Sequence, residues 1–143
     1  MLKKLSPSIL IVLLLGLLLG ASIGCSSNPE ELDAERFLNN YFKYLKNQDF
    51  NTIHSMYAKS AFGVVSSTKA LRGMKKTMRS FGPLQSYEFD RGSTYVKNDQ
   101  GAILSLKLSY DVIYKNMRTR EGFIVTKKNQ GPWRITTHTI ERL

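Results

Sequence analysis

Residues 102–114 have the sequence AILSLKLSYDVIY, in which apolar and polar side chains alternate almost without a break. A period of two places every second side chain on the same face of a β-strand, so this stretch predicts one long half-buried strand. A face this apolar must be covered, and the rest of the chain has to supply the second layer. The residues expected to face the core are Ala102, Leu104, Leu106, Leu108, Tyr110, Val112 and Tyr114, and those on the other face are Ser105, Lys107, Ser109 and Asp111.

The segments on both sides of this strand also alternate, and turn residues separate them. Residues 84–96 predict a preceding strand with a bulge at Gly92, and residues 98–101 predict the turn that follows it. Residues 119–127 and 133–140 predict two further strands, which completes an antiparallel meander. The residues expected to lie on the inner side of these last two strands are Glu121, Phe123, Val125, Trp133 and Ile135.

The sequence before the strands has the periodicity of helices. Apolar residues recur every three or four positions in residues 29–46, which predicts a long amphipathic helix that begins at a proline. Asp49 is placed to cap a second, shorter helix, and residues 67–81 predict a third that stops at Gly82. Helices followed by an antiparallel meander are the order of an α+β fold.

The N-terminus has the composition of a targeting segment. Lys3 and Lys4 precede the stretch ILIVLLLGLLLGA at residues 9–21, which contains no charged side chain. This is the pattern of a secretory signal, and it is shorter than the ~20 apolar residues that a membrane-spanning helix needs. The single cysteine, Cys25, follows directly and excludes a disulfide framework within the chain.

The junction at residues 22–25 resembles the lipobox of bacterial lipoproteins. Gly24 corresponds to the position before the cleavage site and Cys25 to the lipidated residue, whereas Ser22 departs from the preferred leucine. The resemblance implies a signal peptide at residues 1–24, a lipidated Cys25 with a short linker to residue 29, and attachment to a membrane of the cell envelope, facing the periplasm or the exterior. An ordinary signal or an uncleaved anchor is the alternative.

Residues 30–143 resemble the nuclear-transport-factor-two-like superfamily, which has a cystatin-like fold. Three stretches carry the likeness: FLNNYFKYLKNQDFNTIHSMY at residues 37–57, FGPLQSYEF at 81–89 and GPWRITTHTI at 131–140. The resemblance implies N-terminal helices packed on a strongly curved, cone-like antiparallel sheet. It implies no activity, because this fold carries isomerases, dehydratases, scaffolds and binding modules.

No catalytic motif accompanies the fold, so a non-catalytic binding or interaction domain is the first hypothesis. The alternative is a small-ligand carrier, or an isomerase- or dehydratase-like enzyme, that uses the cone with Tyr110, Tyr114 and Glu121 as its polar groups. A deep pocket with convergent polar groups would favour this alternative, whereas a cone filled by Phe, Leu and Trp would favour the first hypothesis.

Histidine and cysteine give no support to a metal site or a cofactor. His54 and His138 are far apart in the chain, and neither has a second ligand at metal-binding spacing. His54 is expected on the polar side of the short helix. His138 has the opposite strand parity to Ile135, so it is expected to be solvated. We therefore expect no metal and no cofactor.

Positive charge is concentrated in one part of the chain. The net charge is +10, and six basic residues but no acidic one lie between Asp49 and Glu88. A secretory signal makes nucleic acid an improbable partner, so anionic lipid or an envelope polymer is expected, with a solvated polar face as the plain alternative. A protein partner or a second copy, bound through the outer sheet face, is a further candidate. The residues that share one helical face are Arg72, Lys75, Lys76 and Arg79.

Overall fold

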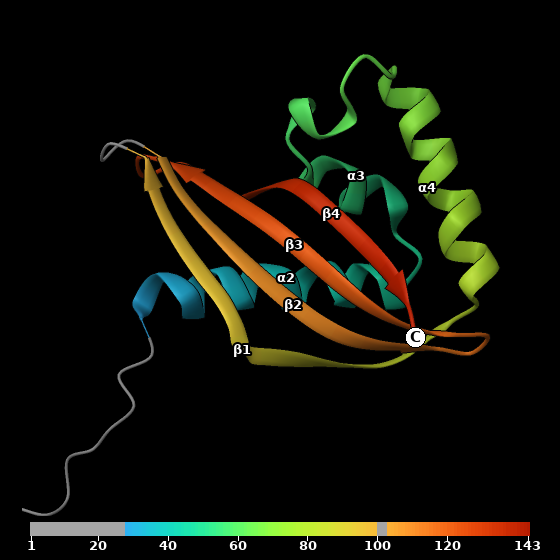
Figure 1. The fold of residues 1–143 in the computed structure, drawn as a ribbon. Helices are drawn as coiled ribbons and strands as arrows, with labels where there is room; N and C mark the ends of the chain where they lie inside the picture. The colour runs from blue at the N-terminus through green and yellow to red at the C-terminus, as the bar shows by residue number, and fades with distance from the viewer. Residues whose placement is uncertain (1–27, 100–102) are drawn as a thin grey trace, which may run out of the picture.

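The computed structural model describes residues 28–99 and 103–143, and for residues 92–99 it describes the backbone alone. The expected leader and the lipidation site at Cys25 lie outside these residues. Half of the turn predicted at 98–101 also lies outside them, and Asn98 and Asp99 belong to the first strand. Three α-helices and a short 3₁₀ helix come first, and four strands follow (Figure 1). The elements are α2 (Pro29–Lys46), α3 (Phe50–Met56), η1 (Lys59–Phe62), α4 (Ser67–Phe81), β1 (Leu84–Asp99), β2 (Ile103–Tyr114), β3 (Arg118–Lys128) and β4 (Arg134–Arg142).

The strands form one antiparallel sheet in the order β1-β2-β3-β4. Figure 1 shows that the sheet is strongly curved, that α2 crosses its concave face, and that α3 and α4 stand together at one end. The predicted α+β class and cone-like architecture are confirmed. Among the described residues, no helix combines the length and the apolar character needed to cross a membrane.

The ends of the helices follow from local sequence. The Asn28 side chain accepts a hydrogen bond from the Glu30 backbone amide at 3.1 Å, which caps α2. Asp49 caps α3 by accepting from the Thr52 hydroxyl and amide, and these bonds lower the pKa of its carboxyl. Gly82 ends α4 with a φ of 81°, where a Cβ would also lie 3.0 Å from the Asn116 side chain.

The core lies between α2 and the concave face of the sheet. Leu38, Tyr41 and Phe42 on α2 are fully buried, as are Leu106 and Leu108 on β2. Each fully buried large apolar side chain contributes about 1.5–3 kcal/mol relative to an exposed one. The predicted inner face of β2 is therefore confirmed for the described residues, and α2 is the layer that covers it.

Two of the pairings contain irregularities. The β1–β2 register shifts between Asp90 and Tyr95, which agrees with the bulge predicted at Gly92. In the β3–β4 pairing, Ile124 pairs with Thr137 while Val125 pairs with Ile135, so Thr136 is an extra residue. This second bulge reverses the inward parity of β4 beyond Ile135.

Candidate functional site

Glu121 on β3 is fully buried, although a lone carboxylate at such a position would be costly. Its Oε1 accepts hydrogen bonds from the Tyr114 hydroxyl at 2.7 Å and from the Thr119 hydroxyl at 3.1 Å. Its Oε2 lies 2.9 Å from His138 Nε2. Three polar side chains, from β2, β3 and β4, therefore converge on one carboxylate, which makes Glu121 the centre of the site.

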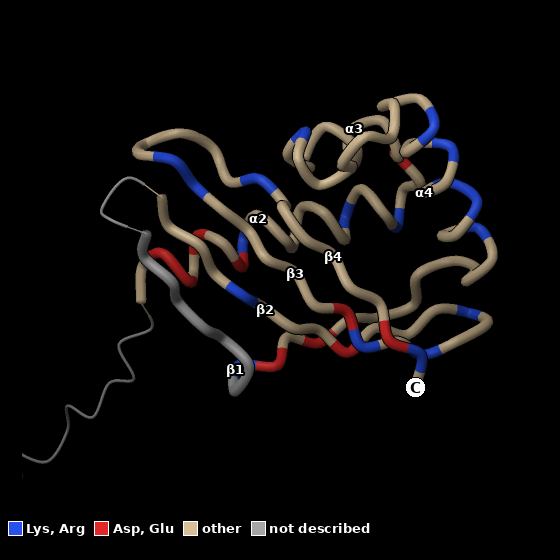
Figure 2. Tube along the Cα trace, turned by 45° about the horizontal axis from the view of Figure 1, so that its top comes forward, with Lys and Arg blue, Asp and Glu red and all other residues tan. Residues whose placement is uncertain are grey.

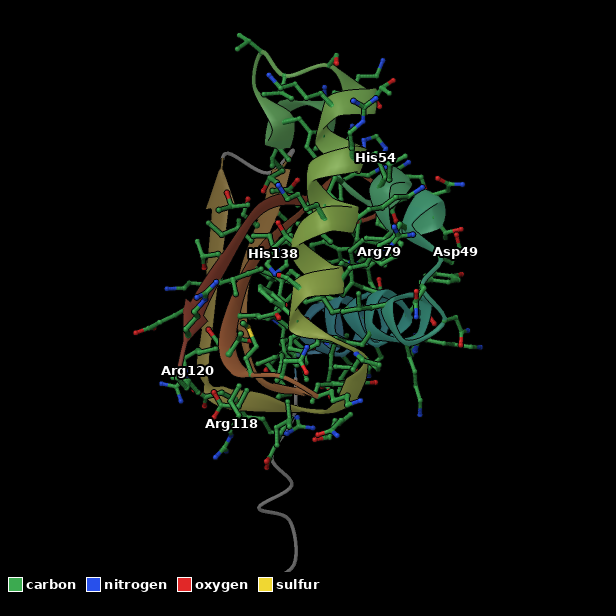
Figure 3. The ribbon with its side chains drawn as sticks, turned by 90° about the vertical axis from the view of Figure 1, so that its right-hand side faces the viewer. Asp49, His54, Arg79, Arg118, Arg120 and His138 are labelled. Carbon is green, nitrogen blue, oxygen red and sulfur yellow. The ribbon has the colours of Figure 1, made fainter. Side chains whose placement is uncertain are left out.

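His138 on β4 connects this carboxylate to α3. Its Nδ1 lies 2.7 Å from the hydroxyl of Tyr57, the residue that ends α3, and its side chain is 8% exposed. Phe123 stacks on the imidazole with 4.2 Å between ring centroids and 17° between planes, which limits its rotation. In Figure 3, His138 lies between the sheet and α4. We refer to Tyr57, His138 and Glu121 as the relay.

The direction of donation along the relay depends on the tautomer of His138. With Glu121 ionised, His138 Nε2–H donates to its Oε2, and Nδ1 accepts from Tyr57 Oη. Burial raises the pKa of Tyr57, and the nearby Glu121 carboxylate adds to this effect. The phenol is therefore protonated at neutral pH and is able to donate. The order hydroxyl–imidazole–carboxylate is that of a proton-transfer triad.

Tyr41 on α2 lies beside the relay. Its ring centroid is 5.8 Å from that of His138 and 6.4 Å from that of Tyr57. Its hydroxyl is buried and makes no hydrogen bond of acceptable geometry within the described part of the chain. Burial raises the pKa of Tyr41 far above its usual value, so this phenol is a neutral donor.

A pocket of about 700 Å³ borders Tyr57, between α3, η1 and the first residues of α4 and β4. A volume of this order is usual for sites that bind small organic molecules. On the opposite side, Tyr114 lines a cavity of about 100 Å³ together with Met78. The hydrogen-bonded network therefore has a large pocket at its Tyr57 end and a small cavity at its Tyr114 end.

The structure unites two of the three residues that the sequence suggested for a cone pocket. Tyr114 donates to Glu121, whereas the ring of Tyr110 packs among Phe42, Phe89 and other aromatic rings. The Tyr110 hydroxyl is buried, with no hydrogen-bond partner among residues 28–91 and 103–143, and burial raises its pKa. Tyr110 therefore belongs to the core.

The prediction that His138 is solvated is wrong. Regular alternation from Ile135 would point residue 138 outward, but the bulge at Thr136 shifts the phase by one residue and directs His138 inward. The Thr136 hydroxyl supports the bulge by donating to the Ile124 carbonyl at 3.1 Å. In the sequence, only the inward parities of Tyr114 and Glu121 on their own strands signalled this site.

His54 is half-buried and lies in the pocket wall rather than in the relay. Its ring stacks on Phe62 at 4.7 Å, and its Nε2 lies 3.2 Å from the Ser67 hydroxyl. Within residues 28–99 and 103–143, no three His, Cys, Asp or Glu side chains are grouped closely enough to hold a metal ion.

Figure 2 shows several Lys and Arg positions, in blue, along the trace of α4. Arg72, Lys76 and Arg79 are exposed and Lys75 is half-buried. Over the part of the chain that the structure describes, none of the four is joined to an acidic side chain by an ion pair. These four residues, which we refer to as the basic surface of α4, lie on a different element from the relay.

The sequence matches no family model, and no curated protein matches it at a significant level. Solved structures share the fold. Aln2 from a Streptomyces species gives a TM-score of 0.56 at 14% identity, over 81% of this chain and 93% of that one. A scytalone dehydratase-like protein from Novosphingobium aromaticivorans gives 0.52 at 10% identity, over 80% and 84%. An aromatic ring hydroxylase-like protein from the same bacterium gives 0.51 at 15% identity, over 82% and 92%.

The prediction of a non-catalytic binding domain, with no enzyme activity, is overturned by these findings. Two of the similar structures have enzyme descriptions, although at such identities the likeness itself shows the fold alone. The relay supplies convergent polar groups, and Tyr57 connects them to a pocket. The alternative, a ligand-binding or enzymatic cone, is better supported, and the chain has the nuclear-transport-factor-two-like cone fold.

Proposed function

We propose that this domain binds a small organic molecule in the pocket beside Tyr57 and moves a proton to and from it through the relay. One observation carries the proposal: a buried carboxylate, an imidazole and a pocket-lining phenol are joined in series at 2.9 and 2.7 Å. A buried Glu and His with no chemical role would be a poor substitute for apolar side chains, because desolvation of charge is costly.

The chemistry is acid–base catalysis of the isomerase or dehydratase type. Tyr57 Oη accepts a proton from a substrate carbon as its own proton passes to His138 Nδ1. The resulting imidazolium is stabilised by Glu121, whose Oε2 lies 2.9 Å away. Return of the proton to another substrate atom completes an isomerisation, and its delivery to a departing hydroxyl group releases water and completes a dehydration.

The proposal is tested with 5-nitrobenzisoxazole, a probe from which a base removes one C–H proton while the N–O bond breaks, giving a coloured cyanophenolate. The full chain should accelerate this reaction, and His138→Gln and Tyr57→Phe should each lower the rate by about 10²-fold or more. Thr137→Ala, an exposed neighbour on β4, is the control and should keep the wild-type rate. Equal rates for folded His138→Gln, Tyr57→Phe and wild type would exclude the relay as a proton carrier.

We also propose that the protein is a lipoprotein of the cell envelope, anchored through Cys25. The apolar leader, the small residues at 22–24 and the position of the only cysteine support this. Two or more acyl chains would hold the protein firmly at a bilayer, since each buried CH₂ contributes about 0.8 kcal/mol. Labelled palmitate should enter the wild-type chain but not Cys25→Ala, and labelling of both or neither would refute the assignment.

Anchoring would bring the basic surface of α4 close to lipid headgroups, which we propose as its partner. Near an anionic surface each Lys or Arg adds about 1 kcal/mol of attraction. The mature domain, without residues 1–24 and with Cys25→Ser, should co-sediment with phosphatidylglycerol vesicles, and adding Lys75→Glu, Lys76→Glu and Arg79→Glu should release it. Binding to neutral phosphatidylcholine vesicles of the same strength would show that headgroup charge is irrelevant.

A further inference from the structure

The charged residues that line the pocket beside Tyr57 are all basic. Its wall includes Lys59, Arg134 and His54, and none of the described residues that line it is Asp or Glu. Lys59 is exposed, and its ammonium pairs with no carboxylate within residues 28–99 and 103–143. An unneutralised cluster in a concave site favours an anion, because the low-dielectric walls screen charge poorly.

Arg134 is held in position while part of its guanidinium stays available. Its Nη1 donates to the Ser55 carbonyl at 2.7 Å, which ties the first residue of β4 to α3. A guanidinium carries five N–H donors, so this bond leaves donors for a carboxylate. A fixed guanidinium loses little side-chain entropy when it binds a ligand, which favours specific recognition.

Apart from Ser55 and Ser67, the remaining wall is aromatic and apolar. Phe62 stacks on His54 with an interplanar angle of 3°, and it lies 5.4 Å from the Tyr57 ring between centroids. Val65, which is 42% exposed, borders the same space. Flat aromatic faces and an aliphatic side chain suit a planar, apolar ligand body.

We infer that the pocket takes an organic acid with one negative charge and a planar apolar body. The carboxylate pairs with Lys59 and Arg134, and the body packs against Phe62, Val65 and Tyr57. The inference rests on the proposed function, since it names the class of molecule on which the relay acts. A cationic ligand would meet like charge from Lys59 and Arg134, and a strongly polar one would leave the aromatic wall unfilled.

The probes are 2-naphthoate and its neutral counterpart 2-naphthamide, which share the same ring system. Binding to the purified full chain is followed by naphthalene fluorescence. We expect naphthoate to bind about tenfold more tightly than naphthamide. The double variant Lys59→Gln/Arg134→Gln should remove that preference while naphthamide binding stays unchanged, and Lys128→Gln, an exposed cation on β3, should behave as wild type.

Each outcome separates the acid preference from the relay. Equal affinity of the two probes for wild type, or a preference that survives the double variant, would overturn the acid assignment. Neither result would alter the 5-nitrobenzisoxazole rates, because that probe is neutral and its reaction depends on His138 and Tyr57. Conversely, a naphthoate preference in a chain whose relay variants keep full rate would retain the acid site and reject the proton relay.

Discussion

The inner face of the sheet has two ends of opposite character. Under α2, aromatic rings fill the space, and Phe42 stacks on Tyr87 at 4.2 Å and contacts Tyr110 at 4.9 Å between centroids. At the other end, beside α3, Glu121 and His138 form a buried hydrogen-bonded pair. Because the same sheet supplies both ends, the difference arises from a few side chains rather than from a change of fold.

Two tyrosines of β2 illustrate this difference between the apolar and the polar part of the inner face. Tyr110 and Tyr114 point to the same side of the sheet, and both are buried. Tyr110 is the backbone partner of Glu121 across the β2–β3 pairing, yet it is Tyr114 that donates to the Glu121 carboxylate. Strand register alone therefore does not determine which polar groups meet, because long side chains lean along the strand.

The largest expected effect is at the apolar end. Phe42→Ala removes a fully buried ring that touches Tyr41, Tyr87 and Tyr110, and it should lower the free energy of unfolding by about 3–5 kcal/mol. Urea unfolding measures the change. Val64→Ala is the control, because Val64 is fully exposed and should change stability by less than about 0.5 kcal/mol. A cost for Phe42→Ala below about 1 kcal/mol would mean that this end is not a packed core.

Replacing Tyr114 or Tyr110 by Phe should change the free energy of unfolding by less than Phe42→Ala does, and the two variants should differ in the direction of the change. Tyr114→Phe deletes a 2.7 Å hydrogen bond to a carboxylate and should cost about 1–3 kcal/mol. Tyr110→Phe deletes a buried hydroxyl for which the described residues offer no partner, so stability should be unchanged or rise by up to about 1 kcal/mol. Thermal unfolding of the two variants and of wild type under identical conditions measures both stability changes. A greater loss for Tyr110→Phe would reverse the assignment of the two ends.

The smallest expected effect is on the outer face, at Asp111. Arg120 donates to its carboxylate at 2.8 and 3.2 Å and thereby lowers the pKa of Asp111. A carboxyl whose pKa is lower in the folded protein stabilises the fold above its unfolded pKa of about 3.9, and this contribution is lost as the pH falls through the folded value. Asp111→Asn should cost less than about 1 kcal/mol at pH 7, because both partners are solvated.

Unfolding of Asp111→Asn and wild type across a pH series tests whether the ionised Asp111 carboxylate stabilises the fold. The difference between the two should shrink as the pH is lowered below about 4. A difference that grows on acidification would show that the charge of Asp111 opposes folding. The comparison also separates exposed pairs from the buried Glu121–His138 pair, whose two side chains are 0% and 8% exposed.

Much of the fold could be predicted from the sequence because periodicity and capping are local. The bounds of α2 follow from Pro29 and the apolar stripe, and Asp49 marks the start of α3. The inner face of β2 follows from strict alternation at residues 104–114. The candidate site was predicted in part, since parity placed Glu121 and Tyr114 on the inner face of the sheet, whereas their contact was not predicted. Tyr57 and His138 were missed because their contacts span 81 positions in the chain.

The sequence by itself determined the helices, the strands, the buried faces of α2 and β2 and the leader-like N-terminus, because each depends on neighbours a few residues apart. Tertiary structure alone decided where His138 points, because one extra residue at Thr136 is stabilised only by pairing with β3. It also decided that Tyr57 lies between a pocket and an imidazole, because that position requires α3 and β4 to pack together. The proposed chemistry depends on those long-range contacts, whereas the architecture depends on local pattern.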